Sequence, residues 1–396
     1  TCISASSKSF AIPAALISNT FSNKSTGTIM LNIHNALKKK NIESYVVWGR
    51  GRKPKDNNEI YMNDKIGIYY HGLYTRFTDK TGFASKRATR KLIKRLEKIK
   101  PDIIHLHNIH GYYINIEILF NYIKKNNIKI VWTLHDCWAF TGHCSHFELI
   151  GCEKWKEGCK CCKQKGKYPR SFIDNSSWNY QRKKELFTGL NMIIVTPSKW
   201  LTNLVKQSYL KQYEVKVVNN GIDTDIFKPR KSDFKKKFNI ENKKVILGVA
   251  SDWTKEKGLY DFYDLSEKID DDVKIVLVGL NSKQMKEIPE NIIGIERTEN
   301  AQQLAEIYTA ADIYFNPTYA DNFPTTNLES LACGTPVFTY NTGGSTECLD
   351  GNNGAITNLK DFSENYKKYL TQKFEINKVK TKLEMESDYI NIYNNL

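Results

Sequence analysis

Two acidic side chains in the second half of the sequence have the types and spacing for binding a sugar phosphate. Asp321 follows an expected strand at 313–315, and Glu329 lies eight positions later, about one turn into an expected helix at 325–332. An acid at the carboxyl end of a strand, beside a helix N-terminus with free backbone N–H groups, suits a sugar joined to a phosphate. Glu329 could also be an ordinary exposed acid on a short helix.

Cysteines form a second group that could do chemistry. Cys159 and Cys162 make a Cys-x-x-Cys pair, and Cys144 and Cys152 stand upstream of them in an irregular stretch. Four thiolates of this kind could hold a structural Zn²⁺ tetrahedrally, although free thiols remain the alternative because the spacing is not that of a common zinc finger. His105, His107 and His110 also resemble a metal cluster, but side chains that alternate on a strand could simply pack together.

Alternating strands and helices must position these residues. Two such alternations predict an α/β fold with two doubly wound parallel sheets. The expected strands lie at 44–48, 102–106, 129–134, 192–196 and 215–218, and then at 245–249, 274–278, 292–295, 313–315 and 337–340. The run 11–17 is interrupted by Pro13 and reads as a poor first strand. Residues 66–83 and 137–175 read as loops that set specificity.

The domain boundaries follow from where the apolar pattern fades. We expect an N-terminal domain at 1–228 that carries a Cys-rich insertion at 137–165. A linker at 229–242 leads to a second Rossmann-like domain at 243–375, and a helix at 376–396 packs back on the first domain. Two such domains leave a cleft lined by the carboxyl ends of both sheets, where α/β proteins bind ligands. The insertion directly follows His135 and is expected to rim that cleft.

Several segments together resemble the retaining glycosyltransferases of family 4, which have the GT-B fold of two facing Rossmann-like domains. Residues 321–329 (DNFPTTNLE) resemble the two-acid donor motif of that family. Residues 334–337 and 343–347 resemble its next two signatures, and 219–229 resemble the segment that closes the N-terminal domain. The resemblance covers nearly the whole chain after Lys24.

The resemblance implies an acceptor-binding N-terminal domain, with the insertion on the acceptor side of the cleft, and a nucleotide-sugar-binding C-terminal domain. It also implies roles for named residues. Glu329 would accept hydrogen bonds from the ribose of a nucleotide-sugar, Asp321 would lie near the donor sugar, and Lys257 would neutralise the departing diphosphate. From the other domain, His135 would contact the transferred sugar, and Gly27 would let an N-terminal loop approach the phosphates. The remaining substrate-binding residues implied by the motif are Asn322, Phe323 and Thr325. No cofactor is then required for catalysis.

Three departures from the family pattern affect the donor site. Asp321 stands where the family has the longer Glu, and Pro324 replaces a glycine and removes an N–H group. Ser251-Asp252-Trp253 occupies the place of an arginine that would help to bind the diphosphate. Lys255 could supply that charge.

The net charge of +16 indicates either an anionic partner or a structural role for the basic residues. Nucleic acid is not expected, because no binding motif accompanies the charge. Residues 86–100 read as a basic amphipathic helix that could rest on an anionic membrane surface, or whose charged face is simply solvated. With neither a secretory signal nor a membrane-spanning run, the expected location is the cytoplasm, peripheral to the inner face of the membrane.

The sequence therefore predicts a retaining glycosyltransferase of surface polysaccharide synthesis. It would move a sugar from a nucleotide-sugar donor to a lipid-linked glycan acceptor. A nucleotide-sugar 2-epimerase of the same architecture and a non-enzymatic basic protein that binds membranes or polyanions are the alternatives.

Overall fold

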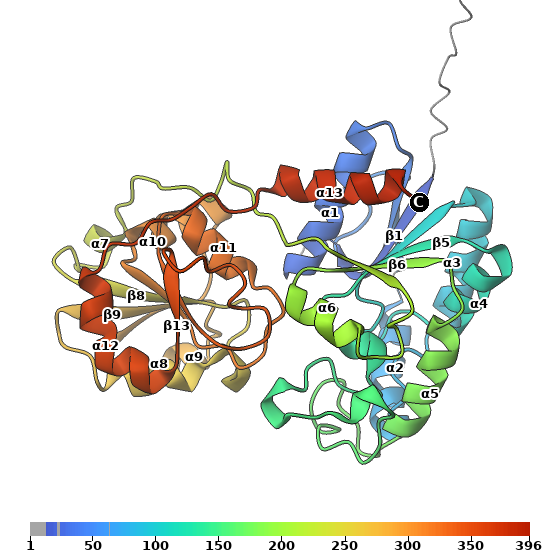
Figure 1. Cartoon of the computed structure of the whole chain (residues 1–396), viewed down its shortest axis with the longest axis horizontal. Coiled ribbons are helices and arrows are strands. Elements are labelled where there is room, and N and C mark those ends of the chain that lie inside the picture. Colours follow the sequence, from blue (N-terminus) through green and yellow to red (C-terminus); the bar gives the residue numbers. More distant parts are fainter. Residues whose placement is uncertain (1–12, 22–23, 63) are drawn as a thin grey trace, which may run out of the picture.

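The N-terminal domain is built on a parallel sheet of seven strands (Figure 1). The structure, a computed structural model, describes residues 13–21, 24–62 and 64–396. The strand order is β3-β2-β1-β4-β5-β6-β7. These strands are β1 (Ala14–Phe21), β2 (Ser44–Gly51), β3 (Glu59–Tyr61), β4 (Ile103–Leu106), β5 (Lys129–Thr133), β6 (Met192–Thr196) and β7 (Glu214–Val217).

The C-terminal domain repeats this plan with six parallel strands in the order β10-β9-β8-β11-β12-β13. They are β8 (Lys244–Val249), β9 (Val273–Val278), β10 (Ile292–Ile295), β11 (Ile313–Asn316), β12 (Val337–Tyr340) and β13 (Gly354–Thr357). Its helices are α7 (Phe234–Lys237), α8 (Leu259–Ser266), α9 (Gln284–Glu287), α10 (Ala301–Ala310), α11 (Thr325–Ala332) and α12 (Leu359–Thr371). The predicted α/β class with two Rossmann-like sheets is confirmed.

Strand β1 corrects the sequence-based expectation that the region after Pro13 makes a poor strand. It is a central strand that pairs with both β2 and β4. Pro13 stands just before the strand, where its missing N–H breaks no ladder bond, and its carbonyl accepts from Asp102 N at 2.9 Å. Ala14 to Ile17 are fully buried, because helices cover both faces of a parallel sheet and select a continuous apolar run.

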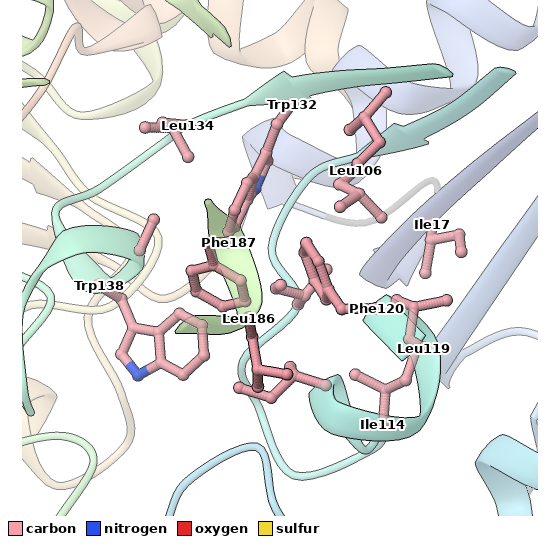
Figure 2. Close-up of a cluster of buried hydrophobic side chains, with 14 of the residues drawn as sticks. Ile17, Leu106, Ile114, Leu119, Phe120, Trp132, Leu134, Trp138, Leu186 and Phe187 are labelled. Carbon is pink, nitrogen blue, oxygen red and sulfur yellow. The ribbon is translucent and has the colours of Figure 1, made fainter. Parts of the chain in front are cut away.

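One face of the N-terminal sheet packs against α3 (Lys86–Ile99), α4 (Ile116–Asn126) and α5 (Ser176–Phe187). Aromatic rings fill this layer, with Phe187 lying 4.5 Å from Phe120 and 4.8 Å from Trp132 between ring centroids (Figure 2). Leu92 and Leu96 of α3 are buried in the same layer. The apolar side of the predicted basic helix therefore faces its own domain, and only its charged side meets solvent.

The other face is covered by α1 (Lys24–Lys39) and by α13 (Lys382–Asn394), which lie together in Figure 1. Helix α13 starts at a capping box formed by Thr381 and Glu384. Its residues Met385, Tyr389 and Tyr393 are buried against the sheet. The last helix of the chain thus completes the core of the first domain.

Helix α2 (Lys65–Thr78) lies where the sequence pattern indicated a loop at 66–83. The Asp64 side chain caps it by accepting from Gly67 N at 2.8 Å. Residues 137–175 contain only short 3₁₀ turns, at Trp138–Phe140, Glu148–Ile150 and Lys154–Lys156. The remaining helix of this domain is α6 (Lys199–Val205). In the part of the chain that the structure describes, no helix is long and apolar enough to cross a membrane.

Candidate active site

A cavity of about 850 Å³ lies between the two domains. The C-terminal domain supplies one wall, with Lys255, Glu256, Lys257, Tyr319, Ala320, Asp321 and Asn322. The opposite wall combines His135 with residues of the segment 145–168, namely Ser145, His146, Glu148, Leu149, Ile150, Lys163, Gln164, Lys167 and Tyr168. Of the predicted site residues, His135, Lys257, Asp321 and Asn322 are therefore brought together, although 187 positions separate His135 from Asn322 along the chain.

Lys257 and Asp321 form an ion pair on the C-terminal wall, with 2.5 Å between Nζ and Oδ2. Lys257 ends a short 3₁₀ turn at Lys255–Lys257, and Gly258 follows it with φ of +75°. A Cβ atom at Gly258 would lie 2.3 Å from the Pro317 carbonyl oxygen. Glycine is therefore required there, because it lets the lysine turn pack directly against the chain that leads from β11 to Asp321.

The glycine pair after β12 supports the loop that carries Asp321. A Cβ at Gly343 would lie 1.8 Å from the Asp321 carbonyl oxygen, and one at Gly344 would lie 2.1 Å from that of Asn322. Gly343 also has φ of +57°, in the left-handed region that favours glycine. The two signatures of the sequence, 321–329 and 343–347, are thus in direct backbone contact.

Asn322 joins the two domains. Its side-chain oxygen accepts from the Ser198 hydroxyl at 2.5 Å, and its amide donates to the His135 carbonyl at 3.1 Å. Asn322 was predicted to bind substrate, but both ends of its side chain already have protein partners. A second contact between the domains comes from the Glu347 carboxylate, which accepts from the backbone N–H groups of Lys199 and Trp200 at the start of α6.

His135 is the half-buried end, at the cavity, of a row of buried imidazoles. Its Nε2 atom is hydrogen-bonded to Nδ1 of His107 at 3.0 Å, and the His107 ring stacks on His105 with centroids 4.3 Å apart. His105 is bonded in turn to the Tyr393 hydroxyl of α13 at 2.7 Å. Burial lowers the pKa of His135 to about 4, so the ring is neutral at pH 7.

A second chain of polar side chains holds the wall beside His135. His110 bonds Asp136 through Nε2 at 2.8 Å and the Tyr168 hydroxyl through Nδ1 at 2.9 Å. Although burial opposes it, the interaction with His110 lowers the pKa of Asp136 to about 2. Tyr168 is thereby fixed in the cavity wall. The position of Tyr168 in the sequence did not indicate this role, because Tyr168 is joined to Asp136 through His110 only in the folded protein.

His146 and Glu148 are further cavity residues without an assigned role in the sequence-based prediction. His146 Nδ1 lies 3.2 Å from Glu148 Oε1. Burial acts against the charge, but the hydrogen bond to Glu148 raises the pKa of His146. The His-x-Glu spacing in the insertion was the available signal.

Glu329 lies apart from this cavity, on α11. Its carboxylate accepts from the Tyr308 hydroxyl of α10 at 3.2 Å. Burial raises the pKa of Glu329 to about 7, because a carboxylate that loses water favours its neutral form. In the described chain, the cavity wall does not include Glu329, Phe323, Thr325 or Gly27.

The other predicted donor residues have structural surroundings that differ from the expectation. Phe323 is buried beside Ile222 and Leu328. Thr325 is the first residue of α11 and Gly27 lies within α1, so Gly27 belongs to a helix rather than to the expected loop. Their predicted contacts with a donor stay predictions.

The four cysteines of the predicted zinc set line one pocket of about 190 Å³ within the insertion, together with His143. The Cys144 thiol is hydrogen-bonded to the Cys162 sulfur. His143 Nδ1 lies 2.5 Å from Asp79 Oδ1, while its buried Nε2 atom has no hydrogen-bond partner among the described residues. Over the same residues, no group of three or more His, Cys, Asp or Glu is arranged to hold a metal ion. The zinc site stays a prediction.

Metal analysis checks that prediction. If the thiols gather around zinc, protein purified under reducing conditions will carry about one zinc per chain, and the Cys159→Ser/Cys162→Ser variant will lose it. Cys161→Ser is the matched control, because Cys161 is exposed in the same segment and should leave the zinc content unchanged. A metal-free parent protein with four reactive thiols would show that the cysteines are free.

Two family models match the chain almost end to end. The model of glycosyltransferase family 4 matches residues 26–226, and that of the group 1 glycosyl transferases matches residues 230–386. Together with the two-domain fold, they define a GT-B glycosyltransferase. The chain belongs to glycosyltransferase family 4, as the sequence motifs predicted.

Relatives and solved structures agree with this class. An Escherichia coli K12 protein assigned to colanic acid biosynthesis as glycosyl transferase WcaC is 23% identical over 346 residues, 82% of each chain. The N,N'-diacetylbacillosaminyl-diphospho-undecaprenol α-1,3-N-acetylgalactosaminyltransferase of Campylobacter jejuni is 27% identical over 39% of this chain and 45% of its own.

Among solved structures, sucrose-phosphate synthase of Thermosynechococcus elongatus has a TM-score of 0.68 at 12% identity, over 97% of this chain and 98% of its own. HepE of Anabaena, solved with UDP-glucose, has a TM-score of 0.63 at 13% identity. The match covers 97% of this chain and 100% of the HepE chain. These neighbours support the GT-B fold. The chain is a glycosyltransferase, and the findings do not favour the epimerase and the non-enzymatic alternatives.

Proposed function

We propose that this glycosyltransferase moves a sugar, with retention at the anomeric carbon, from a nucleotide-sugar to a lipid-linked glycan during bacterial surface polysaccharide synthesis. One observation carries the proposal. The Lys257–Asp321 pair faces His135 and the insertion across a cavity between two Rossmann-like domains. The colanic acid relative supports a role in polysaccharide synthesis, and the Campylobacter relative, whose name includes a diphospho-undecaprenol compound, supports a lipid-linked acceptor.

The donor diphosphate would bind on the C-terminal wall. Lys257 supplies a cation there. Among the described residues, no side chain caps the N-terminus of α11, so its first N–H groups remain free for an anion. Binding would replace the contact between Lys257 and Asp321 by one between Lys257 and phosphate, which frees Asp321 for the hydroxyls of the donor sugar. Glu329, which lies on α11 outside the cavity wall, would accept from the ribose hydroxyls at the far end of the donor.

Transfer would proceed on one face of the sugar. The bond from the anomeric carbon to the phosphate oxygen breaks, the acceptor oxygen attacks from the same side, and its proton passes to the departing phosphate. Lys257 and the helix N-terminus stabilise the charge that develops on the phosphate. His135 is neutral at pH 7 and would hydrogen-bond the sugar rather than protonate it.

The acceptor would occupy the N-terminal wall. His146, Glu148 and Tyr168 offer polar groups for glycan hydroxyls or for a lipid phosphate, and Leu149 and Ile150 add exposed apolar surface beside them. The basic side chains Lys163 and Lys167 in the same wall would favour an anionic acceptor.

A panel of nucleotide-sugars, tested for hydrolysis without acceptor, checks the proposal. We expect one donor to release its nucleoside diphosphate slowly and to yield the sugar with the anomeric configuration of the donor. That nucleotide should bind with a Kd of about 1 mM or better, which at tenfold excess adds about 1.4 kcal/mol of stability and raises Tm. A product with inverted configuration would overturn retention, and an epimerised, intact nucleotide-sugar would overturn transfer.

A further inference from the structure

Helix α2 presents apolar side chains to solvent and polar side chains to the protein. Ile66, Tyr69, Tyr70, Leu73 and Phe77 form one stripe at helical spacing, with exposures from 44% to 85%. On the opposite side, His71 and Thr75 are fully buried. A surface helix of a globular protein normally shows the reverse arrangement, so the exposed stripe requires another explanation than core packing.

Specific hydrogen bonds hold α2 in this orientation. His71 Nε2 accepts from Gly82 N at 3.0 Å, which leaves Nδ1 to donate to the Ser85 hydroxyl at 2.9 Å. At the C-terminal end, the Asp79 backbone N–H donates to the Thr75 carbonyl, and its side chain accepts from Asn175 N at 2.9 Å. Rotation of the helix to bury the apolar stripe would break these buried contacts and leave their polar groups unpaired.

A neighbouring segment extends the exposed apolar surface. The ring of Phe172 lies 5.5 Å from that of Phe77, and Phe172 N donates to the Arg76 carbonyl at 2.8 Å. Phe172 is itself 52% exposed. We define the α2 face as Ile66, Tyr69, Tyr70, Leu73, Phe77 and Phe172.

Basic side chains predominate around the α2 face, with acids only at its edges: Asp64 precedes α2, and the exposed Asp174 lies two residues after Phe172. Lys65 and Arg76 belong to α2, and Lys165 and Arg170 flank Phe172; each of the four is exposed. No acid occurs between residues 65 and 78 or between residues 159 and 173. Tyrosine, phenylalanine and aliphatic side chains surrounded by lysine and arginine match the headgroup region of an anionic bilayer, where rings and chains enter the apolar boundary and cations meet phosphate.

We propose that the α2 face inserts into the surface of an anionic lipid bilayer. Helix α3, whose basic amphipathic sequence also suits an anionic membrane, keeps its leucines in the core and can add only charge. The inserted surface adjoins the acceptor wall, because Tyr168, four residues before Phe172, lines the cavity and is bonded to His110. This inference rests on the proposed function in one respect: a lipid-linked acceptor in that bilayer would reach the cavity past the 168–172 segment.

Vesicle sedimentation tests the proposal without donor or acceptor. The full chain should sediment with vesicles of phosphatidylethanolamine and phosphatidylglycerol, and much less with phosphatidylcholine alone. The Tyr70→Ser/Leu73→Ser/Phe77→Ser variant should bind the anionic vesicles about tenfold or more weakly, since three inserted side chains are lost. These residues are exposed, so the variant should keep its Tm and its donor hydrolysis in solution.

The matched control removes as much exposed apolar surface elsewhere. Tyr260, Ile356 and Leu383 are also exposed, and their triple replacement by Ser should leave vesicle binding unchanged. Failure of the parent protein to bind anionic vesicles would overturn the proposal, as would equal binding by the α2 variant. A dimer of the parent that the α2 variant converts to a monomer would assign the face to a second copy instead. Absence of donor hydrolysis would overturn the proposed function and leave the vesicle result standing.

Discussion

Replacing Glu329 by glutamine is expected to stabilise the unliganded protein at pH 8 while nearly abolishing sugar transfer. The folded pKa of about 7 lies above the ordinary value of 4.5. Between those values the unfolded chain has released the proton that the folded protein keeps, so stability falls as pH rises. Above pH 7 the ionised Glu329 lowers the free energy of unfolding by at most about 3 kcal/mol. Glutamine cannot ionise, so the variant does not suffer this loss.

The activity changes in the opposite direction, because the uncharged amide has only one accepting oxygen and cannot accept from a ribose diol with two oxygens as a carboxylate does. We expect kcat/KM to fall about a hundredfold. In the parent protein, donor affinity should rise with pH through about 7 as Glu329 ionises. Thermal unfolding at pH 5 and pH 8 together with steady-state rates provides the measurement.

The sign of the Tm change separates this account from a merely structural role for Glu329. At pH 5 the two proteins should unfold at similar temperatures. Glu364→Gln, on the exposed side of α12, is the matched control and should change neither Tm nor rate. A Glu329→Gln variant that is less stable at pH 8, or that transfers sugar at the parent rate, contradicts the assignment.

Replacing Lys257 by alanine is expected to lower kcat by about 10²- to 10³-fold, the range seen when one group that stabilises a developing negative charge is removed. The loss is expected because Lys257 is the cation already paired with Asp321 in the cavity wall. Removing it leaves the Asp321 carboxylate without its ion-pair partner near the donor phosphates, which adds repulsion to the lost attraction. Single-turnover rates and nucleotide binding by calorimetry separate the two effects.

Lys255 offers a control within the same turn. It also lines the cavity but is not paired with Asp321, so Lys255→Ala should reduce activity much less than Lys257→Ala. The Lys257→Ala/Asp321→Asn variant should recover part of the nucleotide affinity without recovering kcat. Equal losses for the two lysines would show that the cavity needs positive charge in general rather than Lys257 in particular.

The C-terminal half of the site could be predicted because its geometry is encoded locally. Gly258, Gly343 and Gly344 are needed where the backbone passes within contact distance of Pro317, Asp321 and Asn322, so glycines and acids recur at fixed spacings. Helix α11 and the strands before and after it follow from the same short stretch. Parallel strands buried on both faces also produce unbroken apolar runs that are easily recognised.

The features that the sequence did not reveal depend on tertiary context. An apolar stripe on α2 that faces solvent has no separate signature, because the pattern alone does not say which side meets the core. The pattern of α3 is equally ambiguous, but there the leucines face the core. Asn322 and Glu347 contact Ser198 and the α6 N-terminus across the domain interface. The prediction of a poor strand at 11–17 was wrong because a proline is tolerated immediately before a strand.

Helix α13 has a consequence for the order in which the protein is made. A ribosome completes the N-terminal sheet long before it translates residues 382–396, and the whole C-terminal domain is synthesised in between. Until Met385, Tyr389 and Tyr393 arrive, the sheet surface that includes Leu16 and Val46 lacks part of its cover. The imidazole row behind His135 also lacks the Tyr393 hydroxyl. The N-terminal domain therefore matures only after the C-terminal domain has been made, and the cavity wall that carries His135 is not finished until α13 has been translated.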